Sequence, residues 1–329
     1  MRRTVIILAV AGALVAPATP AFAHGGDAPD STAYRTTVTG ITPAVTGLRV
    51  RAVEAGARLE LTNDTGRTIE ILGYAGEPYL EVRPDGTYQN DNSPSAYVNQ
   101  TLAGDTPVPA TADPTAPPQW RRVSTEPTVR WHDRRALWTG DDLPPQAQAE
   151  PDRSHRLRTW SVPLREQART FEIRGTLDYL PPPAAWLWWL GALLLAAAVT
   201  VAGLRRPLAV AVLALVAGTT LAAYGVMRAL ESGISTVLFV AAAVAVAAGQ
   251  WRVPFFTAPF FTALAGALLA IFGGFADLGV FQAAVVPLAG PAWFARVAVL
   301  VAIGVGVGMA ATGVLRLRTM SDPGAKVVT

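Results

Sequence analysis

Long apolar runs dominate the last part of the chain. A transmembrane helix needs about 20 mostly apolar residues to cross the hydrocarbon core of a bilayer. Runs of about this length are Ala185–Leu204, Leu208–Met227, Ile234–Gln250, Phe255–Ala276 and Trp293–Leu315. The pattern therefore predicts a membrane domain of five spans over residues 184–315, followed by a short tail at residues 316–329.

Residues 24–183 show a different pattern, in which apolar and polar residues alternate. Alternation with a period of two is typical of strands that bury one face. It occurs at Leu48–Arg51, Leu59–Thr62, Ile69–Ile71, Tyr79–Val82, Leu157–Trp160 and Phe171–Leu177. Turn residues such as Pro84-Asp85-Gly86 separate the early segments. Short strands at this spacing predict an all-β, Ig-like sandwich, so the chain as a whole is predicted to be α+β.

Two proline-rich segments interrupt the predicted strands, at residues 104–119 and 140–152. Proline removes a donor from the strand ladder, so both segments are expected to be loops. Between them lies a candidate binding patch: Trp131, Arg134, Arg135 and Trp138. The alternative is structural, because tryptophan is commonly buried and arginine commonly packs on it, which would fix a long insertion to the β domain.

The first 23 residues have the features of a secretory signal peptide. Arg2 and Arg3 precede the apolar run Val5–Val15, and Ala21-Phe22-Ala23 has the small-x-small form of a cleavage site. Cleavage there is expected, with an uncleaved anchor helix as the alternative. Export of this end would place residues 24–183 outside the cytoplasm.

Basic residues predict the orientation of the spans. With residues 24–183 outside, the inner loops and tail would carry Arg205, Arg206, Arg252, Arg316, Arg318 and Lys326. The outer sides would carry Arg228 and Arg296. Basic residues favour the cytoplasmic side, so this distribution predicts a multi-pass protein of the cell membrane with an extracytoplasmic N-terminal domain and a cytoplasmic C-terminus. The lipid bilayer is therefore its first predicted partner.

Charge and composition exclude several classes of protein. Residues 24–183 hold 17 Arg against 21 Asp or Glu, whereas the remainder holds 10 basic and 3 acidic residues. The formal net charge of +3 therefore comes from the termini and the membrane flanks, and no nucleic-acid partner is expected. The chain has no cysteine, which excludes disulfides, thiolate metal sites and cysteine nucleophiles.

Histidine supplies the one candidate for metal chemistry. After cleavage His24 would be the first residue, and its α-amine and imidazole together suit Cu(II). His132 and the neighbouring Asp133 would complete the predicted copper site. The alternative is that His24 only begins a flexible His-Gly-Gly-Asp tail.

Polar residues are sparse in the membrane block. Asp277 and Arg296 are the candidates for a functional membrane site. An ionisable residue in lipid costs free energy, so it is usually found where it serves a function. Both fall near predicted span ends, where a contact between them is expected. Gly304, Gly308 and Thr312 recur at spacings of four, which is typical of close packing between helices.

No catalytic motif is present in the sequence. The patterns G-x-S-x-G, S-x-x-K and H-E-x-x-H do not occur, and neither does a glycine-rich phosphate loop. No pair of acids stands out from the polar faces of the predicted strands. The chain is therefore not predicted to be an enzyme.

Several segments resemble an uncharacterised family of actinobacterial conserved membrane proteins. They are Leu61–Gly66, Gly73–Leu80, Pro84–Gly86, Trp131–Asp133 and the five-span block. The resemblance covers nearly the whole chain and implies the same architecture without an established activity. At the central patch, relatives show the pattern W-H-D-H-R-x-H-W, whereas this chain has Arg134 and Leu137 in place of two of those histidines.

The predicted mature start at His24 and the β domain are also similar to the periplasmic copper-binding CopC and CopD group. The membrane partner in that group has more spans and intramembrane histidine ligands, which this chain lacks. The predicted function is a membrane-bound binding, sensing or accessory module, whose partner is another envelope protein or a metal ion. The alternatives are copper handling through His24, His132 and Asp133, and a small-molecule permease that depends on Asp277 or Arg296.

Overall fold

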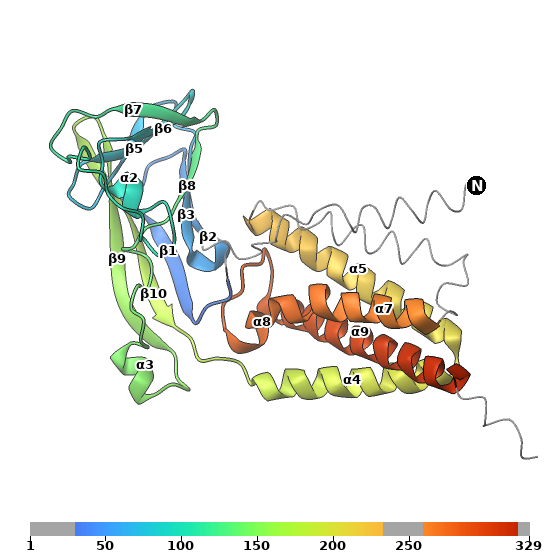
Figure 1. The fold of residues 1–329 in the computed structure, drawn as a ribbon. Coiled ribbons are helices and arrows are strands. Elements are labelled where there is room, and N and C mark those ends of the chain that lie inside the picture. Colours follow the sequence, from blue (N-terminus) through green and yellow to red (C-terminus); the bar gives the residue numbers. More distant parts are fainter. Residues whose placement is uncertain (1–29, 233–258, 322–329) are drawn as a thin grey trace, which may run out of the picture.

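The computed structural model describes residues 30–232 and 259–321. It divides into an antiparallel β region and a group of apolar helices, which confirms the predicted α+β composition (Figure 1). The β region lies at one end of the long helices, and strand β10 (Arg169–Tyr179) leads directly into helix α4 (Ala185–Arg205). The predicted signal peptide at residues 1–23 and the candidate ligand His24 lie outside the described residues.

The strands of the β region form two antiparallel sheets. The larger sheet has the order β1-β10-β9-β4-β5-β6-β7, and the smaller sheet has the order β2-β3-β8. Besides β10, the larger sheet contains β1 (Tyr34–Thr42), β9 (His155–Glu166), β4 (Ile69–Leu72), β5 (Pro78–Arg83), β6 (Gly86–Asn90) and β7 (Trp120–Ser124). The smaller sheet contains β2 (Leu48–Val53), β3 (Arg58–Asn63) and β8 (Thr128–Trp131). All six segments predicted from alternation lie within strands, whereas the pattern does not predict β1, β6, β7 or β8.

The two sheets share one hydrophobic core. In β3, Leu59 and Leu61 are buried in it, while Glu60 between them is only half-buried. Ile71 of the larger sheet joins the same core, and so does Trp131 at the end of β8. A strand turns successive side chains to opposite faces, so this burial follows directly from the period of two in the sequence.

The two proline-rich segments differ in structure. Residues 104–119 contain no helix or strand, as expected. Residues 140–152 contain the short helix α3 (Pro145–Ala149), so the expectation of a loop is wrong for this part. Pro145 lies in the first turn of α3, where a proline is tolerated because its missing N–H would have no partner within the helix.

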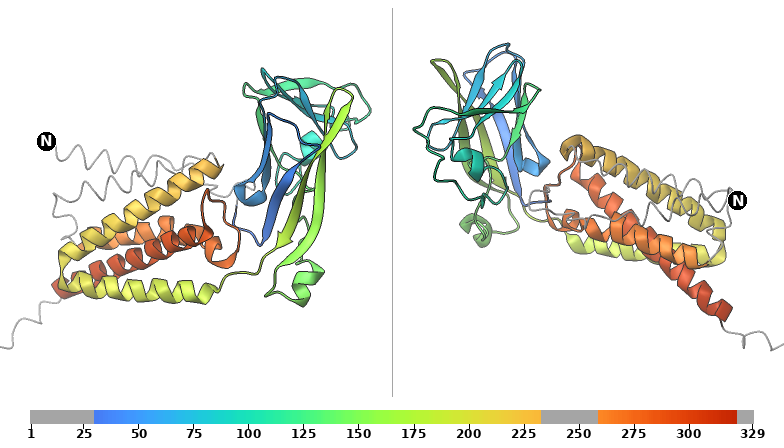
Figure 2. Two further views of the ribbon diagram at one scale, coloured as in Figure 1. Left: turned by 180° about the vertical axis from the view of Figure 1, so that it is seen from behind. Right: turned by 45° about the horizontal axis from the view of Figure 1, so that its top comes forward.

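Four helices in the described residues are long and apolar enough to cross a membrane, as expected of a membrane protein. They are α4, α5 (Pro207–Ser232), α7 (Pro259–Gly273) and α9 (Ala292–Ser321). The predicted span at Ile234–Gln250 lies outside the described residues. Two short helices, η4 (Phe275–Asp277) and α8 (Gly279–Gln282), come between α7 and α9. Figure 2 shows from two further directions that the long helices lie side by side with the β region at one end.

Helix α9 packs against α4 through its small residues. A Cβ atom added to Gly304 would lie 2.8 Å from the side chain of Leu195, and one added to Gly308 would lie 2.6 Å from Cβ of Val199. Thr312 is fully buried on the same face and donates a hydrogen bond to the Gly308 carbonyl at 2.8 Å. The prediction of close helix packing on this face is confirmed.

Helix α9 also packs closely against α7, backbone against backbone. A Cβ atom added to Gly306 would lie 2.5 Å from the Ala270 nitrogen, and one added to Gly266 would lie 2.5 Å from the Gly306 oxygen. No flexible side chain separates the two helices at this crossing. The absence of side chains on both glycines therefore sets the distance between α7 and α9.

Candidate functional site

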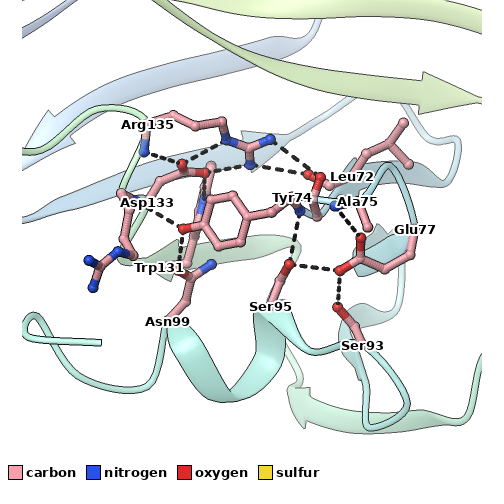
Figure 3. A network of polar contacts seen from close by, with 12 residues as sticks. Leu72, Tyr74, Ala75, Glu77, Ser93, Ser95, Asn99, Trp131, Asp133 and Arg135 are labelled. Atoms are coloured by element: carbon pink, nitrogen blue, oxygen red, sulfur yellow. Dashed lines mark hydrogen bonds and ion pairs between the residues drawn. The ribbon is translucent and has the colours of Figure 1, made fainter. Parts of the chain in front are cut away.

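The predicted binding patch is organised around the carboxylate of Asp133, which is 1% exposed (Figure 3). The Arg135 guanidinium donates to both Asp133 oxygens, at 2.8 Å each. The indole nitrogen of Trp131 donates to the same carboxylate at 3.0 Å. Arg135 also donates to the Leu72 carbonyl at 3.1 Å, which ties the segment after β8 to the end of β4. Both carboxylate oxygens of Asp133 are thus engaged with the protein.

Tyr74 extends this network on its other side. Its hydroxyl accepts a hydrogen bond from the Arg134 backbone N–H at 2.9 Å and donates to the side-chain oxygen of Asn99. The Arg135 guanidinium lies 4.9 Å from the centre of the Tyr74 ring, within the range of a cation–π contact. Burial raises the pKa of Tyr74 to about 12, so the hydroxyl keeps its proton and acts as a donor.

A second buried carboxylate, Glu77, fixes the turn between β4 and β5 to helix α2 (Ser95–Val98). The hydroxyls of Ser93 and Ser95 each donate to it at 2.7 Å, and the Ala75 N–H donates at 2.9 Å (Figure 3). Burial alone would raise the pKa of Glu77, but these hydrogen bonds outweigh burial and hold the pKa below its ordinary value. Folding therefore stabilises the ionised form of Glu77.

Glu77→Gln is expected to make the free energy of unfolding less sensitive to a fall in pH. The pKa of Glu77 is lower in the folded chain than its ordinary value of 4.5, so its contribution is complete above that pH and is lost as the pH falls through the folded value. The variant should be less stable near neutral pH and should lose less stability than the parent chain on acidification. Thermal unfolding measured across this pH range tests the prediction. The exposed Glu126→Gln should leave the pH profile unchanged, and equal profiles for all three proteins would contradict the assignment.

His132 belongs to a separate ionic network on the smaller sheet. Arg58 Nε donates to His132 Nε2 at 3.2 Å, so the imidazole proton lies on Nδ1 and is donated to the Ala57 carbonyl at 2.8 Å. Arg58 also pairs with Glu54 at 3.1 Å, and Glu54 is only 1% exposed. Arg130 lies 3.8 Å from the other oxygen of Glu54.

This ionic network reaches the helices. The Glu54 backbone N–H donates to the carboxylate of Glu231, near the end of α5, at 2.8 Å. Glu54 and Ala55 adopt left-handed φ angles of 57° and 58°, which cost a non-glycine residue of the order of 1–2 kcal/mol each. Their conformation is stabilised by the ion pair on the Glu54 side chain and by the contact with α5. The turn is therefore held by parts of the chain far apart in sequence.

A second contact joins the β region to the segment between α8 and α9. Thr32 and Val285 exchange two backbone hydrogen bonds of 2.9 Å, as neighbouring antiparallel strands do. We call this contact and the Glu54–Glu231 contact together the junction. With the direct connection from β10 to α4, the junction attaches the β region to the helices at three places.

The residues predicted to bind copper do not come together as a site in the described chain. Both ring nitrogens of His132 already have partners, and the Asp133 carboxylate faces the cation of Arg135. No group of three or more His, Asp or Glu residues suited to a metal occurs within residues 30–232 and 259–321. His24 lies outside these ranges. The donor set that is present does not fit a copper ion.

The other residues of the predicted patch have structural contacts. Trp138 is half-buried, stacks on Tyr34 at 5.8 Å and donates its indole N–H to the Asp142 carbonyl at 3.0 Å. Arg134 donates to the Ala103 carbonyl at 2.8 Å. These contacts join Trp138 to the proline-rich segment 140–152 and Arg134 to the residue just before segment 104–119.

The expected contact between Asp277 and Arg296 does not form. Asp277 instead pairs with Arg228 of α5, at 2.5 Å, and accepts a hydrogen bond from the Tyr224 hydroxyl. Arg296 donates to three carbonyl oxygens around the end of α8, those of Val280, Ala283 and Ala284, at 2.9, 2.9 and 3.2 Å. An arginine that binds the free carbonyls at a helix end has no need of a carboxylate, which explains the different pairing.

The cavities formed by the described residues include two that indent the β region. The larger one, of about 510 Å³, lies beside β2, and its charged side chains are already paired as Arg49–Asp64 and Arg51–Glu60. The smaller one, of about 330 Å³, is lined by residues of both sheets, among them Trp131 and His132. Of the predicted patch, only Trp131 lines this cavity. Comparisons with protein-family models, with curated proteins and with solved structures find no match.

The sequence pattern gives no signal for several residues of these networks. Glu54, Glu77 and Asn99 are buried, although residues of these polar types are usually exposed and nothing in their sequence neighbourhood indicates burial. A buried carboxylate is recognised only when its donors are known, and here the donors come from other parts of the chain.

Proposed function

We propose that the chain is a multi-pass protein of the cell membrane that holds its β region outside the cell as a binding or sensing module. The observation that carries this proposal is the position of the β region at one end of the helices, opposite the basic helix ends. Arg205 ends α4, and Arg316 and Arg318 lie in the last turns of α9. Basic residues favour the cytoplasmic side, so the β region belongs to the outer side.

Two structural details belong to this proposal. The first is that the two sheets, which share one core, form an Ig-like sandwich. The second is that residues 233–258 contain a fifth membrane crossing. The second assignment is supported by the ends of the neighbouring helices. Helix α5 ends beside the β region, where Glu231 meets Glu54, whereas α7 begins beside Gly313, near the C-terminal end of α9. The apolar run Ile234–Gln250 is long enough for a crossing that would join these two ends.

The junction supports a module that is coupled to the membrane rather than loosely tethered to it. Two contacts beyond the covalent connection hold the β region in a defined position on the helices. In the proposed function, the partner is a small ligand or another envelope protein that binds the β region. No observation in the described residues favours copper handling or a permease in its place.

Single-cysteine labelling tests this topology without background, because the natural chain contains no cysteine. Ser154→Cys places a thiol on an exposed loop of the β region, and Thr319→Cys places one near the end of α9. A membrane-impermeant maleimide should label Ser154→Cys in intact cells and should label Thr319→Cys only after lysis. The cysteine-free parent is the control for specificity. Labelling of Thr319→Cys in intact cells, with Ser154→Cys protected, would reverse the proposed orientation.

A further inference from the structure

The cavity of about 330 Å³ is lined by residues of both sheets and of the segment around helix α2. Strands β6 and β7 of the larger sheet line one side, and β8 of the smaller sheet lines the other. Its apolar lining residues are Tyr79, Leu80, Ala96, Val123, Val129 and Trp131. A volume of this size lies at the lower end of the range found for small-molecule sites, about 300–1,000 Å³.

One buried polar group in the wall of this cavity has no partner. Asn99 lines the cavity and is 5% exposed. Its side-chain oxygen accepts from Tyr74, but its amide nitrogen meets no acceptor in hydrogen-bonding geometry anywhere in the described chain. The amide is close enough to Tyr79 to offset part of the rise in pKa that burial causes there, yet the two groups do not form a hydrogen bond. A buried donor without an acceptor destabilises the fold, and an acceptor on a ligand would remove that cost.

The charge of the wall indicates which kind of acceptor fits. Arg58 and Arg130 both line the cavity, and no Asp or Glu stands among the lining residues. The carboxylates that pair with these arginines, Glu54 and Glu60, belong to the network outside the cavity. An arginine carries five N–H donors, so a guanidinium can serve a ligand and a neighbouring carboxylate at the same time. The amides of Gln89 and Gln100 add further donors.

We propose that this cavity binds a small carboxylate with a compact apolar body. The carboxylate meets Arg58, Arg130 and the free amide of Asn99, and the apolar body packs on Tyr79 and Trp131. This inference rests on the proposed function as a binding module and names the class of its ligand. The same two arginines lie beside Glu54, whose backbone contacts Glu231 of α5. This chain of contacts links the proposed ligand site to the helices.

The test uses the purified full-length chain in lipid nanodiscs. Acetate, hexanoate and benzoate are titrated by calorimetry, each beside its neutral amide, namely acetamide, hexanamide and benzamide. At least one carboxylate is expected to bind with a Kd below about 1 mM. Its amide should bind about tenfold more weakly or worse, because charge-assisted hydrogen bonds are about twice as strong as neutral ones. Equal binding of acid and amide, or no binding by any of the three acids, would overturn the proposal.

Matched variants show whether binding occurs in this cavity. Gln100 is an exposed lining residue, so Gln100→Glu adds a negative charge at the cavity without a cost in folding. It should weaken carboxylate binding about fivefold or more through repulsion at short range. Gln119→Glu adds the same charge at an exposed position outside the lining and should leave the Kd unchanged. Equal losses in the two variants would place the binding elsewhere and overturn the proposal.

Asn99→Asp tests the interior donor directly. The substitution keeps the acceptor for Tyr74 and replaces the unpartnered amide by an oxygen that repels a carboxylate. It should abolish carboxylate binding, and a melting temperature close to that of the parent shows that the chain is folded. If this variant does not fold, the Gln100→Glu and Gln119→Glu pair decides alone. Correct single-cysteine labelling with no carboxylate binding would remove this inference only, whereas reversed labelling would remove the proposed function.

Discussion

Asp133→Ala is expected to lower the free energy of unfolding by about 3–5 kcal/mol, because it leaves a cation in the protein without its counter-ion. Both Asp133 oxygens bind Arg135, and the carboxylate also accepts from the buried Trp131 indole. The substitution therefore removes an ion pair and leaves a second buried donor without an acceptor. Thermal unfolding of the purified full chain, followed by tryptophan fluorescence, measures the loss.

The ion pair Arg121–Asp91 supplies the control. Its side chains are 55% and 30% exposed, so Asp91→Ala should change the free energy of unfolding by less than about 1 kcal/mol. Replacing both partners of the buried pair, as Asp133→Leu with Arg135→Met, should cost less than Asp133→Ala alone, because no charge then remains unpaired. Equal effects of Asp133→Ala and Asp91→Ala would show that the buried network does not stabilise the fold.

Gly306→Ala is expected to destabilise the helices by about 1–3 kcal/mol, the usual effect of one added methyl group at a site with no room for it. The new Cβ would lie 2.5 Å from the Ala270 nitrogen and 2.7 Å from the Gly266 oxygen. Both atoms belong to the backbone of α7 and cannot turn aside as a side chain would. The yield of folded protein and its melting temperature in detergent should both fall.

Gly279→Ala is the matched control for this prediction. A Cβ atom added to Gly279 would meet its nearest neighbour, Cβ of Ser31, at 3.5 Å, which is an ordinary contact. The same chemical change should therefore alter the free energy of unfolding by no more than about 0.5 kcal/mol and leave the melting temperature nearly unchanged. A loss of stability as large as that of Gly306→Ala would mean that any methyl group added near these helices destabilises the protein. The close crossing of α7 and α9 would then not explain the effect of Gly306→Ala.

The sequence predicts the parts of this fold that depend on one physical requirement at a time. Lipid demands an apolar run of a fixed minimum length, so the four described spans are visible directly. Strands that bury one face are visible for the same reason, as in β3 with Leu59 and Leu61. Strand β1 is not visible, because threonines lie on both of its faces and its less exposed face is only half-buried. Strand β7 has the sequence WRRVS, which places two arginines side by side and breaks the alternation.

The buried networks depend on several distant segments at once, which is why the sequence predicts them only in part. The Asp133–Arg135 pair is two residues apart and agrees with the structural interpretation of the Trp131–Trp138 patch. Glu54 is different, because its partners are Arg58 nearby, Arg130 on another strand and Glu231 on α5. The sequence contains each of these residues but not their proximity. The same is true of Asp277, which pairs with Arg228 rather than with Arg296, the partner that the sequence suggests.

The three places at which the β region meets the helices have a mechanical consequence. They lie on the start of α4, the end of α5 and the segment after α8, so each involves a different part of the helical group. A body supported at three places cannot swing freely as it could on a single hinge. If α5 slid along its axis by one residue, about 1.5 Å, the whole pair of sheets would tip. Any shift of the β region relative to the helices would therefore break at least one of these contacts.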